Sequence, residues 1–439
     1  MAPCAETPPM GWNSWDCFGT TVTEAEVLAN AQFLHDHLLA HGWDTVVVDI
    51  AWYDPTARAH GYTTGAPLAL DAHGRQLPAA NRFPSAAGGL GFAPLAAAVH
   101  QLGLRFGVHV LRGIPRLAVE RDLPVLGTGW TARDAADLSS TCAWNPDNYG
   151  LDHDHPAAQA YLDSQVAQLA AWGVDLLKVD DILAPYHDRE IEGWSRAIER
   201  SGRAVVLSLS PGTGLSTARL GHLREHAQMW RICDDLWDRW PDVHAQFARL
   251  ARWAPHQRAG GWADADMLPL GHIGIRAERG EDRQSRLTLD EQRTLLTLWV
   301  MARSPLMFGG DLPTSSPATI DLLTTPAVSH VLRTSTHGQE ALREPLPAGP
   351  GGAMPDGELI VWTARDDDAT RYAALFSTAE TAAEVRIPLI SLLERTVDPH
   401  VEDLWDPRAE LALDGGDLVL EVPAHGVRWL SFSGSFAVP

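Results

Sequence analysis

The stretch Asp175-Leu176-Leu177-Lys178-Val179-Asp180-Asp181 gives the clearest indication of the fold. Its apolar residues form a short run that ends in charge, which predicts a buried strand with polar groups at its carboxyl end. Just before it, Asp154-His155-Pro156 begins a segment with Leu162, Val166 and Leu169 at helical spacing. This spacing predicts a helix that starts at the proline. A helix followed by a buried strand is the repeating unit of an α/β fold.

The same unit recurs on both sides of this stretch. Strands are predicted near Pro8–Trp15, Thr45–Ile50, Arg105–Val110, Ala204–Ser210, Gln228–Cys233, Trp253–Gly261 and Ser304–Phe308. Helices are predicted to begin at the capping sequences Thr23–Glu26 and Thr288–Glu291. Such alternation indicates parallel strands joined by crossover helices. We therefore expect a (β/α)8 TIM barrel over residues 1–333, with a doubly wound open sheet as the alternative.

The pattern changes after residue 333. Short β-branched and aromatic runs are separated by turn sequences at Ala348–Gly352 and Asp414–Gly416. The runs are Leu359–Trp362, Tyr372–Phe376, Ala383–Ile387, Leu418–Val422 and Val427–Phe432. They predict a C-terminal antiparallel β-sandwich over residues 334–439.

Composition excludes several classes of function. The 439 residues carry a net charge of −22, which argues against a nucleic-acid partner. No apolar run reaches the ~18 residues of a membrane span, so no membrane partner is expected. The segment Met1–Glu6 does not resemble a signal peptide, and the four cysteines form no CxxC motif, which together favour a cytoplasmic location. The oligomeric state stays open, and a homo-oligomer is one option.

Tryptophan is unusually abundant, with 17 residues against 6 tyrosines and 10 phenylalanines. Tryptophan faces stack on the C–H surfaces of sugars, so this favours a carbohydrate ligand. Bulky core packing is the other explanation.

Charged residues gather where the predicted strands end, which is the catalytic face of a TIM barrel. Lys178 and Asp180 are two residues apart on a strand, so their side chains share a face. The lysine would keep the aspartate ionised, as a nucleophile or an anchor for hydroxyls requires. A structural ion pair inside the barrel is the alternative. Asp181 points to the other face and is expected to cap a loop.

A second pair of carboxylates follows the sixth strand. Asp234 and Asp235 come shortly after Arg231. A carboxylate facing Asp180 would complete the acid pair of glycoside hydrolysis. The alternative is that one aspartate caps a helix and the other is exposed to solvent. The pattern alone does not indicate whether Asp234 or Asp235 would be the catalytic carboxylate.

Two histidine-containing segments carry residue types that can bind metal ions. The residues Asp152-His153-Asp154-His155 precede Pro156 and are better explained as the start of a helix. His37 and His41 end a helix before Gly42, where imidazole suits the helix dipole. We therefore predict no metal site.

Several motifs in the same order resemble glycoside hydrolase family 27, the α-galactosidase family. They are Pro9–Trp15, Asp49–Trp52, Trp172–Asp180, Trp230–Trp240, Gly261–Leu268, Trp299–Pro305 and Gly309–Leu312. The resemblance implies a (β/α)8 barrel with a C-terminal antiparallel β domain. It also implies that Asp180 is the nucleophile and that Asp235, four residues after Arg231, is the acid/base.

The resemblance implies the substrate contacts as well. Lys178 and Arg231 are implied as ligands of sugar hydroxyls, Trp15 as part of the pocket wall, and Asp49 as the carboxylate on the C4 side of the sugar. Further implied contacts are Ile50, His109, Cys142, Ser210 and Asp266.

Four departures from the family pattern carry information. Ile50 stands where α-galactosidases usually have a second acidic residue, and His109 stands where they often have tyrosine. Ser210-Pro211 replaces the usual acidic residue and tryptophan after the fifth strand. Ile182 occupies the position of the usual partner of Cys142, so no disulfide is expected there.

Ile50 bears on the substrate. Isoleucine offers no acceptor to the hydroxymethyl group of galactose, and an unpartnered buried hydroxyl costs on the order of 1–3 kcal/mol. L-Arabinopyranose is galactose without C6, and some family members are β-L-arabinopyranosidases. We therefore expect terminal β-L-arabinopyranosides as substrates. If Ile50 only packs behind the site, the activity would be that of an α-D-galactosidase.

The sequence thus predicts a retaining exo-glycosidase that needs no cofactor or metal and takes a small carbohydrate. Asp180 would attack the anomeric carbon, and Asp235 would protonate the leaving oxygen and then activate water. Two rival classes remain: a metal-dependent barrel lyase or isomerase that uses Asp180 and Asp235 as Mg²⁺ ligands, and a catalytically silent sugar-binding protein.

Overall fold

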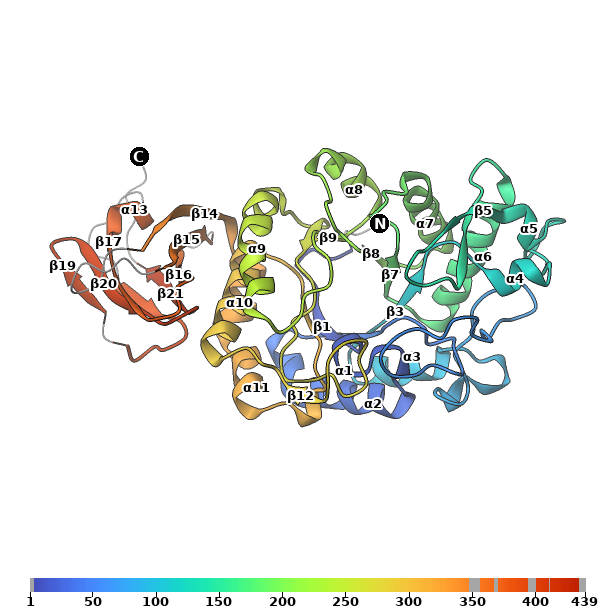
Figure 1. Ribbon diagram of the computed structural model, residues 1–439, viewed down its shortest axis with the longest axis horizontal. Helices are drawn as coiled ribbons and strands as arrows, with labels where there is room; N and C mark the ends of the chain where they lie inside the picture. The colour runs from blue at the N-terminus through green and yellow to red at the C-terminus, as the bar shows by residue number, and fades with distance from the viewer. Residues whose placement is uncertain (1–3, 347–355, 367–369, 394–399, 410, 434–439) are drawn as a thin grey trace. The chain divides into compact units, whose positions relative to one another are not determined.

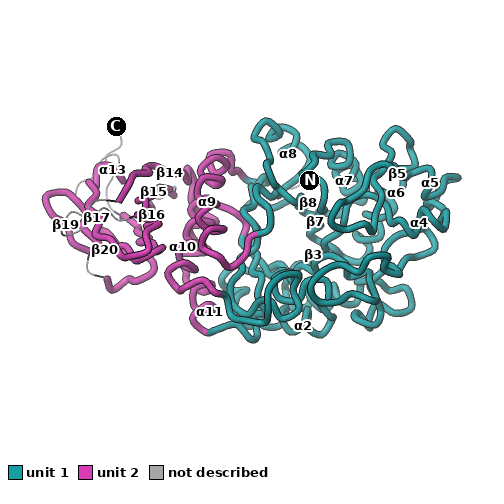
Figure 2. The backbone as a smooth tube through the Cα atoms, in the orientation of Figure 1, with its two compact units in different colours: residues 1–235, 259–285, 306–316 teal, residues 236–258, 286–305, 317–439 magenta. Residues whose placement is uncertain are grey.

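The computed structural model describes residues 4–346, 356–366, 370–393, 400–409 and 411–433. The chain forms two compact units, shown in different colours in Figure 2. Unit 1 contains residues 1–235, 259–285 and 306–316, and unit 2 contains residues 236–258, 286–305 and 317–439.

Unit 1 is built around an eight-stranded parallel sheet (Figure 1). Its strands are β1 (Met10–Asn13), β2 (Thr45–Val48), β3 (Arg105–Leu111), β7 (Leu176–Asp180), β8 (Val206–Leu209), β9 (Met229–Arg231), β10 (Trp262–Asp264) and β13 (Leu306–Phe308). Neighbours in the sheet follow chain order, and β13 pairs back with β1. A parallel bridge between Leu268 and Phe308 joins the segment after β10 to β13. The sheet therefore closes into the expected TIM barrel.

Helices of unit 1 connect successive barrel strands. They are α2 (Glu24–Phe33), α3 (Ala93–Gln101), α6 (Pro156–Trp172), α7 (Asp188–Ser201) and α8 (Leu220–His226). Thr23 and Glu26 form the expected capping box of α2. The His155 Nδ1 atom accepts a hydrogen bond from the Ala157 N–H at the start of α6, which confirms a capping role there.

The connection from β3 to α6 is long and has its own structure. It contains β4 (Ile114–Pro115), α4 (Arg116–Glu120), α5 (Ala132–Ala135), β5 (Ala136–Thr141) and β6 (Asn148–Leu151). The three strands form a small antiparallel sheet in the order β4-β6-β5. This sheet holds the segment that carries Cys142 and Trp144.

In its described residues, unit 2 combines five α-helices with antiparallel sheets. The helices are α9 (Trp240–Trp253), α10 (Leu289–Ala302), α11 (Pro317–Thr324), α12 (Pro326–Thr334) and α13 (Leu389–Leu393). One sheet has the order β14-β15-β16-β21-β18, and the other has the order β17-β20-β19. Their bounds are β14 (Thr336–Pro345), β15 (Glu358–Arg365), β16 (Arg371–Ser377), β17 (Ala383–Pro388), β18 (His400–Asp403), β19 (Ala412–Asp414), β20 (Asp417–Val422) and β21 (Val427–Ser433).

The two sheets of unit 2 share one apolar core. Val361 and Leu375 come from the larger sheet, and Val385, Leu418 and Leu420 come from the smaller one. Alternate residues of β17 and β20 are buried, as expected for strands with one solvated face. The β-sandwich predicted from the sequence is thereby confirmed.

Most predicted elements are found within two residues of their expected bounds, but the seventh strand was misplaced. Trp253 is the last residue of α9, in which Val243, Phe247 and Leu250 are buried at helical spacing. The strand begins at Trp262 and has only three residues, too few to show a pattern. The turn expected at Ala348–Gly352 lies outside the described residues, and the boundary expected at residues 333–334 stays a prediction. Among the described residues, no helix is long and apolar enough to cross a bilayer.

Candidate active site

A cavity of about 270 Å³ opens where the strands of unit 1 end. It is lined by Trp15, Asp49, Tyr62, His109, Trp144, Lys178, Asp180, Pro211, Asp234, Asp235, Glu278 and Arg279. Asp49 directly follows β2, His109 lies near the end of β3, and Asp180 is the last residue of β7. The cavity is therefore at the carboxyl face of the barrel, where TIM-barrel active sites are built.

Asp180 is surrounded by cationic and hydrogen-bond-donating groups. Its Oδ2 atom is 3.0 Å from Nε2 of His109, and its Oδ1 atom accepts the backbone N–H of Asp181 at 2.8 Å. Burial alone would raise the pKa of Asp180, but the contact with His109 and the charges of His109 and Lys178 lower it to about 2. The carboxylate is thus ionised at neutral pH.

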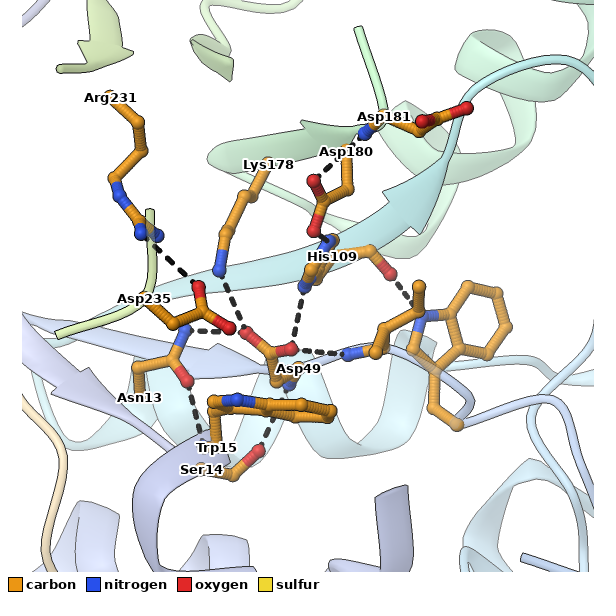
Figure 3. Close-up of polar contacts among 12 residues, drawn as sticks. Asn13, Ser14, Trp15, Asp49, His109, Lys178, Asp180, Asp181, Arg231 and Asp235 are labelled. Carbon is orange, nitrogen blue, oxygen red and sulfur yellow. Dashed lines mark hydrogen bonds and ion pairs between the residues drawn. The ribbon is translucent and has the colours of Figure 1, made fainter. Parts of the chain in front are cut away.

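Asp49 organises the cations around the nucleophile candidate (Figure 3). Its carboxylate contacts Nδ1 of His109 at 2.6 Å and Nζ of Lys178 at 3.3 Å, and it accepts a hydrogen bond from Nδ2 of Asn13 at 2.9 Å. Burial opposes ionisation, but His109 and Lys178 hold the pKa of Asp49 well below its usual range.

His109 bridges the two carboxylates through its two ring nitrogens. Burial opposes protonation, but the charge of Asp49 and the contacts with Asp49 and Asp180 raise the pKa of His109 above its ordinary value. The imidazole ring thus lies between two carboxylates, one at each ring nitrogen, and its protonated form would give each of these buried charges an opposite partner.

Asp235 is held by a different cation. Nη2 of Arg231 is 3.1 Å from Oδ1 of Asp235, and Nη1 of Arg231 is 2.7 Å from Oδ1 of Asp266. Burial raises the pKa of Asp266 to about 7. The charge of Arg231 lowers this pKa, and the charge of Asp235 raises it further. The Asp235 carboxylate is one-third exposed, so it reaches both the cavity and solvent. That position suits a group that exchanges protons.

Asp181 does not cap a loop, which corrects the expectation from its position. Its carboxylate is 2.9 Å from Nε of Arg112, and the same Nε donates to the Asp181 carbonyl at 2.7 Å. Asp181 has a positive φ of 58°, which is uncommon outside glycine. Arg112 therefore holds a strained residue in place directly after Asp180.

The structure brings six of the predicted site residues to the cavity wall: Trp15, Asp49, His109, Lys178, Asp180 and Asp235. Five others are buried and are not among the lining residues of this cavity: Ile50, Cys142, Ser210, Arg231 and Asp266. Arg231 and Asp266 act on Asp235 through the contacts above. The backbone N–H of Ile50 donates to Oδ1 of Asp49 at 2.8 Å. Cys142 is a free thiol, as expected from Ile182 at its usual partner position.

Three lining residues were missed by the sequence analysis: Tyr62, Glu278 and Arg279. Tyr62 stacks on Trp15 with ring centroids 6.0 Å apart and also contacts the ring of Trp144 at 5.3 Å. All three missed residues lie in loops without strand or helix periodicity, so only the density of aromatic residues hinted at their role.

Comparison with known proteins gives the same picture. A family profile described as alpha galactosidase A matches residues 150–332. A crystal structure of a family 27 β-L-arabinopyranosidase from Geobacillus stearothermophilus, in complex with arabinose, is 44% identical, with a TM-score of 0.92 over 98% of both chains. The wild-type structure of that enzyme also has a TM-score of 0.92. The α-galactosidase of Cyamopsis tetragonoloba is 24% identical over 429 residues, which cover 96% of this chain and 85% of that protein.

The chain is a TIM barrel with two aspartates in one cavity at its carboxyl face. It is also similar to a glycosidase over nearly its whole length. Together these findings identify it as a glycoside hydrolase. The match to the Geobacillus enzyme covers nearly all of both chains. The chain therefore belongs to glycoside hydrolase family 27.

Proposed function

We propose that this glycosidase hydrolyses terminal β-L-arabinopyranosides with retention of configuration. The observation that carries the proposal is the pairing of Asp180, held ionised by His109 and Lys178, with Asp235 on the wall of the same cavity. An ionised carboxylate beside a second, proton-exchanging one is what a double displacement needs.

The mechanism assigns one role to each aspartate. Asp180 attacks the anomeric carbon while Asp235 gives its proton to the departing glycosidic oxygen, so that the aglycone leaves as a neutral alcohol. Asp235 then takes a proton from water, which attacks the glycosyl–Asp180 ester and releases the sugar. Nη2 of Arg231 lies 3.1 Å from Oδ1 of Asp235 and so positions this carboxyl group on the cavity wall.

The size of the cavity supports removal of one terminal sugar. About 270 Å³ lies just below the ~300–1,000 Å³ of most small-molecule sites, which suits a single pyranose ring. The indole of Trp15 on the wall offers a face on which the C–H groups of the sugar can stack.

Two observations favour arabinopyranose as that sugar. Ile50, next to Asp49, is buried and does not line the cavity, so this position presents no acceptor to a hydroxymethyl group. The similar Geobacillus enzyme is a β-L-arabinopyranosidase whose structure contains arabinose. The second candidate is an α-D-galactosidase, which the similarity to the Cyamopsis tetragonoloba enzyme supports.

One assay tests the proposal. Hydrolysis of p-nitrophenyl β-L-arabinopyranoside is compared with that of the α-D-galactopyranoside at equal enzyme concentration, with Asp180→Asn as the inactive control. A higher kcat/KM for the arabinoside supports the proposal, and a higher value for the galactoside makes the chain an α-galactosidase. Both assays are repeated in EDTA, where loss of activity would support metal-dependent chemistry instead. The cytoplasmic location and the oligomeric state remain predictions.

A further inference from the structure

Three potential metal ligands meet between two helices of the barrel, away from the catalytic cavity. Glu192 lies on α7, and His222 and His226 lie one turn apart on α8. One ligand atom from each side chain lies within 4.8 Å of the other two. The two imidazole rings have centroids 4.6 Å apart. Figure 1 shows α7 and α8 next to each other, and none of the three residues lines the catalytic cavity.

A tyrosine orients one of the two histidines. The Tyr186 hydroxyl and Nδ1 of His222 are 2.7 Å apart, and the guanidinium of Arg219 lies 4.4 Å from the centre of the tyrosine ring. This contact fixes the imidazole ring and leaves Nε2 for another partner. A hydrogen bond on the second ring nitrogen is the usual support of a metal-binding histidine.

The free nitrogen of His222 points to the cluster. Its Nε2 atom is buried, lacks a hydrogen-bond partner, and lies 3.5 Å from Oε1 of Glu192. A buried nitrogen without a hydrogen bond is costly unless another group or an ion contacts it. Arg196 is 3.9 Å from the other oxygen of Glu192, so Oε1 stays directed at the imidazole.

We propose that Glu192, His222 and His226 bind a divalent transition-metal ion, with Zn²⁺ as the best fit. Two nitrogens and one carboxylate oxygen are ligands for Zn²⁺, whereas Mg²⁺ and Ca²⁺ take oxygen ligands. With bonds of about 2.0–2.1 Å, a tetrahedral ion holds its ligand atoms roughly 3.3 Å apart. Small rotamer changes bring the three atoms, now within 4.8 Å, to that spacing. Water takes the fourth position.

The bound ion would cross-link α7 to α8. Helix α7 follows the strand that ends in Asp180, and Tyr186 lies in the loop between them. The ion would therefore stabilise the part of the barrel that leads away from the nucleophile, without taking part in bond cleavage.

Spectroscopy on the full-length, chelator-treated protein tests this site. Co²⁺ is titrated in and followed by its visible absorption, and Zn²⁺ is then added in competition. We expect the absorption to saturate at one equivalent and to disappear with Zn²⁺. His226→Ala and Glu192→Gln should each weaken binding by more than tenfold, and Tyr186→Phe should weaken it about tenfold. Hydrolysis of the glycoside should be unchanged in all three, which shows that they are folded.

The matched control is the double variant His37→Ala/His41→Ala, which removes another pair of histidines four residues apart. It should bind one equivalent as the wild type does. Zn²⁺ should also raise the temperature of unfolding of the wild type and of this control, but not of His226→Ala. Binding that survives both His226→Ala and Glu192→Gln, or that fails to saturate at one equivalent, would overturn the proposal.

Discussion

Nε2 of His109 lies 3.0 Å from Oδ2 of Asp180, so a buried histidine whose pKa is raised is in direct contact with the proposed nucleophile. The contact joins two adjacent strands, β3 and β7, in which His109 is paired in register with Lys178. A tyrosine at this position would supply a hydrogen bond without a positive charge. The histidine supplies the charge, and this contributes to the low pKa of Asp180.

The first prediction concerns pH. In His109→Gln the amide keeps a hydrogen-bond donor but removes the charge, so the pKa of Asp180 should rise from about 2. The nucleophile must be ionised, and a raised pKa means that it becomes protonated at higher pH. The acidic limb of kcat/KM should therefore move to higher pH, as measured over the range in which circular dichroism shows the variant folded. His37→Gln, at an exposed position, serves as the control. If the acidic limb of kcat/KM does not move in His109→Gln, His109 does not act on the ionisation of Asp180.

The second prediction concerns the nucleophile itself. Asp180→Asn should reduce kcat/KM on the order of 10³-fold or more, equivalent to about 4 kcal/mol of transition-state stabilisation, because a neutral amide cannot form the ester. Thermal unfolding should show that the fold survives. Appreciable hydrolysis by the folded variant would place the nucleophile elsewhere.

The third prediction separates two adjacent aspartates. Asp235→Ala should lower the rate strongly with poor leaving groups and much less with p-nitrophenolate, whose departure needs no proton. Asp234→Ala is the matched control, because Asp234 also lines the cavity but has no assigned role. For each variant, kcat/KM is measured for a series of aryl glycosides and plotted against the pKa of the leaving phenol. The slope should be steeper for Asp235→Ala than for Asp234→Ala. Equal losses for all leaving groups in Asp235→Ala would contradict the acid role.

The fourth prediction concerns the choice of sugar. Ile50→Asp adds an acceptor beside Asp49 and should raise the ratio of kcat/KM for the α-D-galactoside over the β-L-arabinopyranoside about tenfold or more, since ~1.4 kcal/mol is a factor of ten. Arabinoside hydrolysis should fall, because the new carboxylate is partly desolvated with nothing to bind. Ile50→Val keeps the apolar character and should leave the ratio unchanged. If Ile50→Asp also leaves it unchanged, Ile50 only packs behind the site.

The fifth prediction concerns stereochemistry. NMR spectra recorded in the first minutes of hydrolysis should show the released sugar with the anomeric configuration of the substrate. Retaining carboxyl pairs stand about 5–5.5 Å apart, and inverting pairs stand about 6.5–9.5 Å apart to admit a water molecule. Release of the opposite anomer would rule out the covalent step at Asp180.

The sequence predicted the barrel well because its strands are apolar runs with charged ends. β7 illustrates this, since Leu176 and Leu177 are buried and the strand ends at Asp180. The same reasoning failed at β10, where three residues carry no periodicity and the preceding helix continues to Trp253. Short strands depend on their neighbours, and no local pattern reveals those neighbours.

Site residues that lie together on one strand or in one motif, such as Lys178 and Asp180, could be predicted from the sequence. Contacts between residues from distant segments could not be predicted. The bridge from Asp49 through His109 to Asp180 joins three strands, and its charge state depends on burial that no spacing reveals. The same holds for Arg112 and Asp181, and for Glu192, which reaches His222 from another helix.

The cavity wall has two sources, and this has an evolutionary consequence. Asp49 and Asp180 stand at the ends of β2 and β7, whereas Tyr62, Trp144, Asp235, Glu278 and Arg279 lie in loops that follow barrel strands. Loops tolerate substitution and insertion far better than barrel strands. Descendants of this chain can therefore change the loop residues of the cavity wall, and with them the range of substrates, while the carboxylates at the strand ends stay as they are.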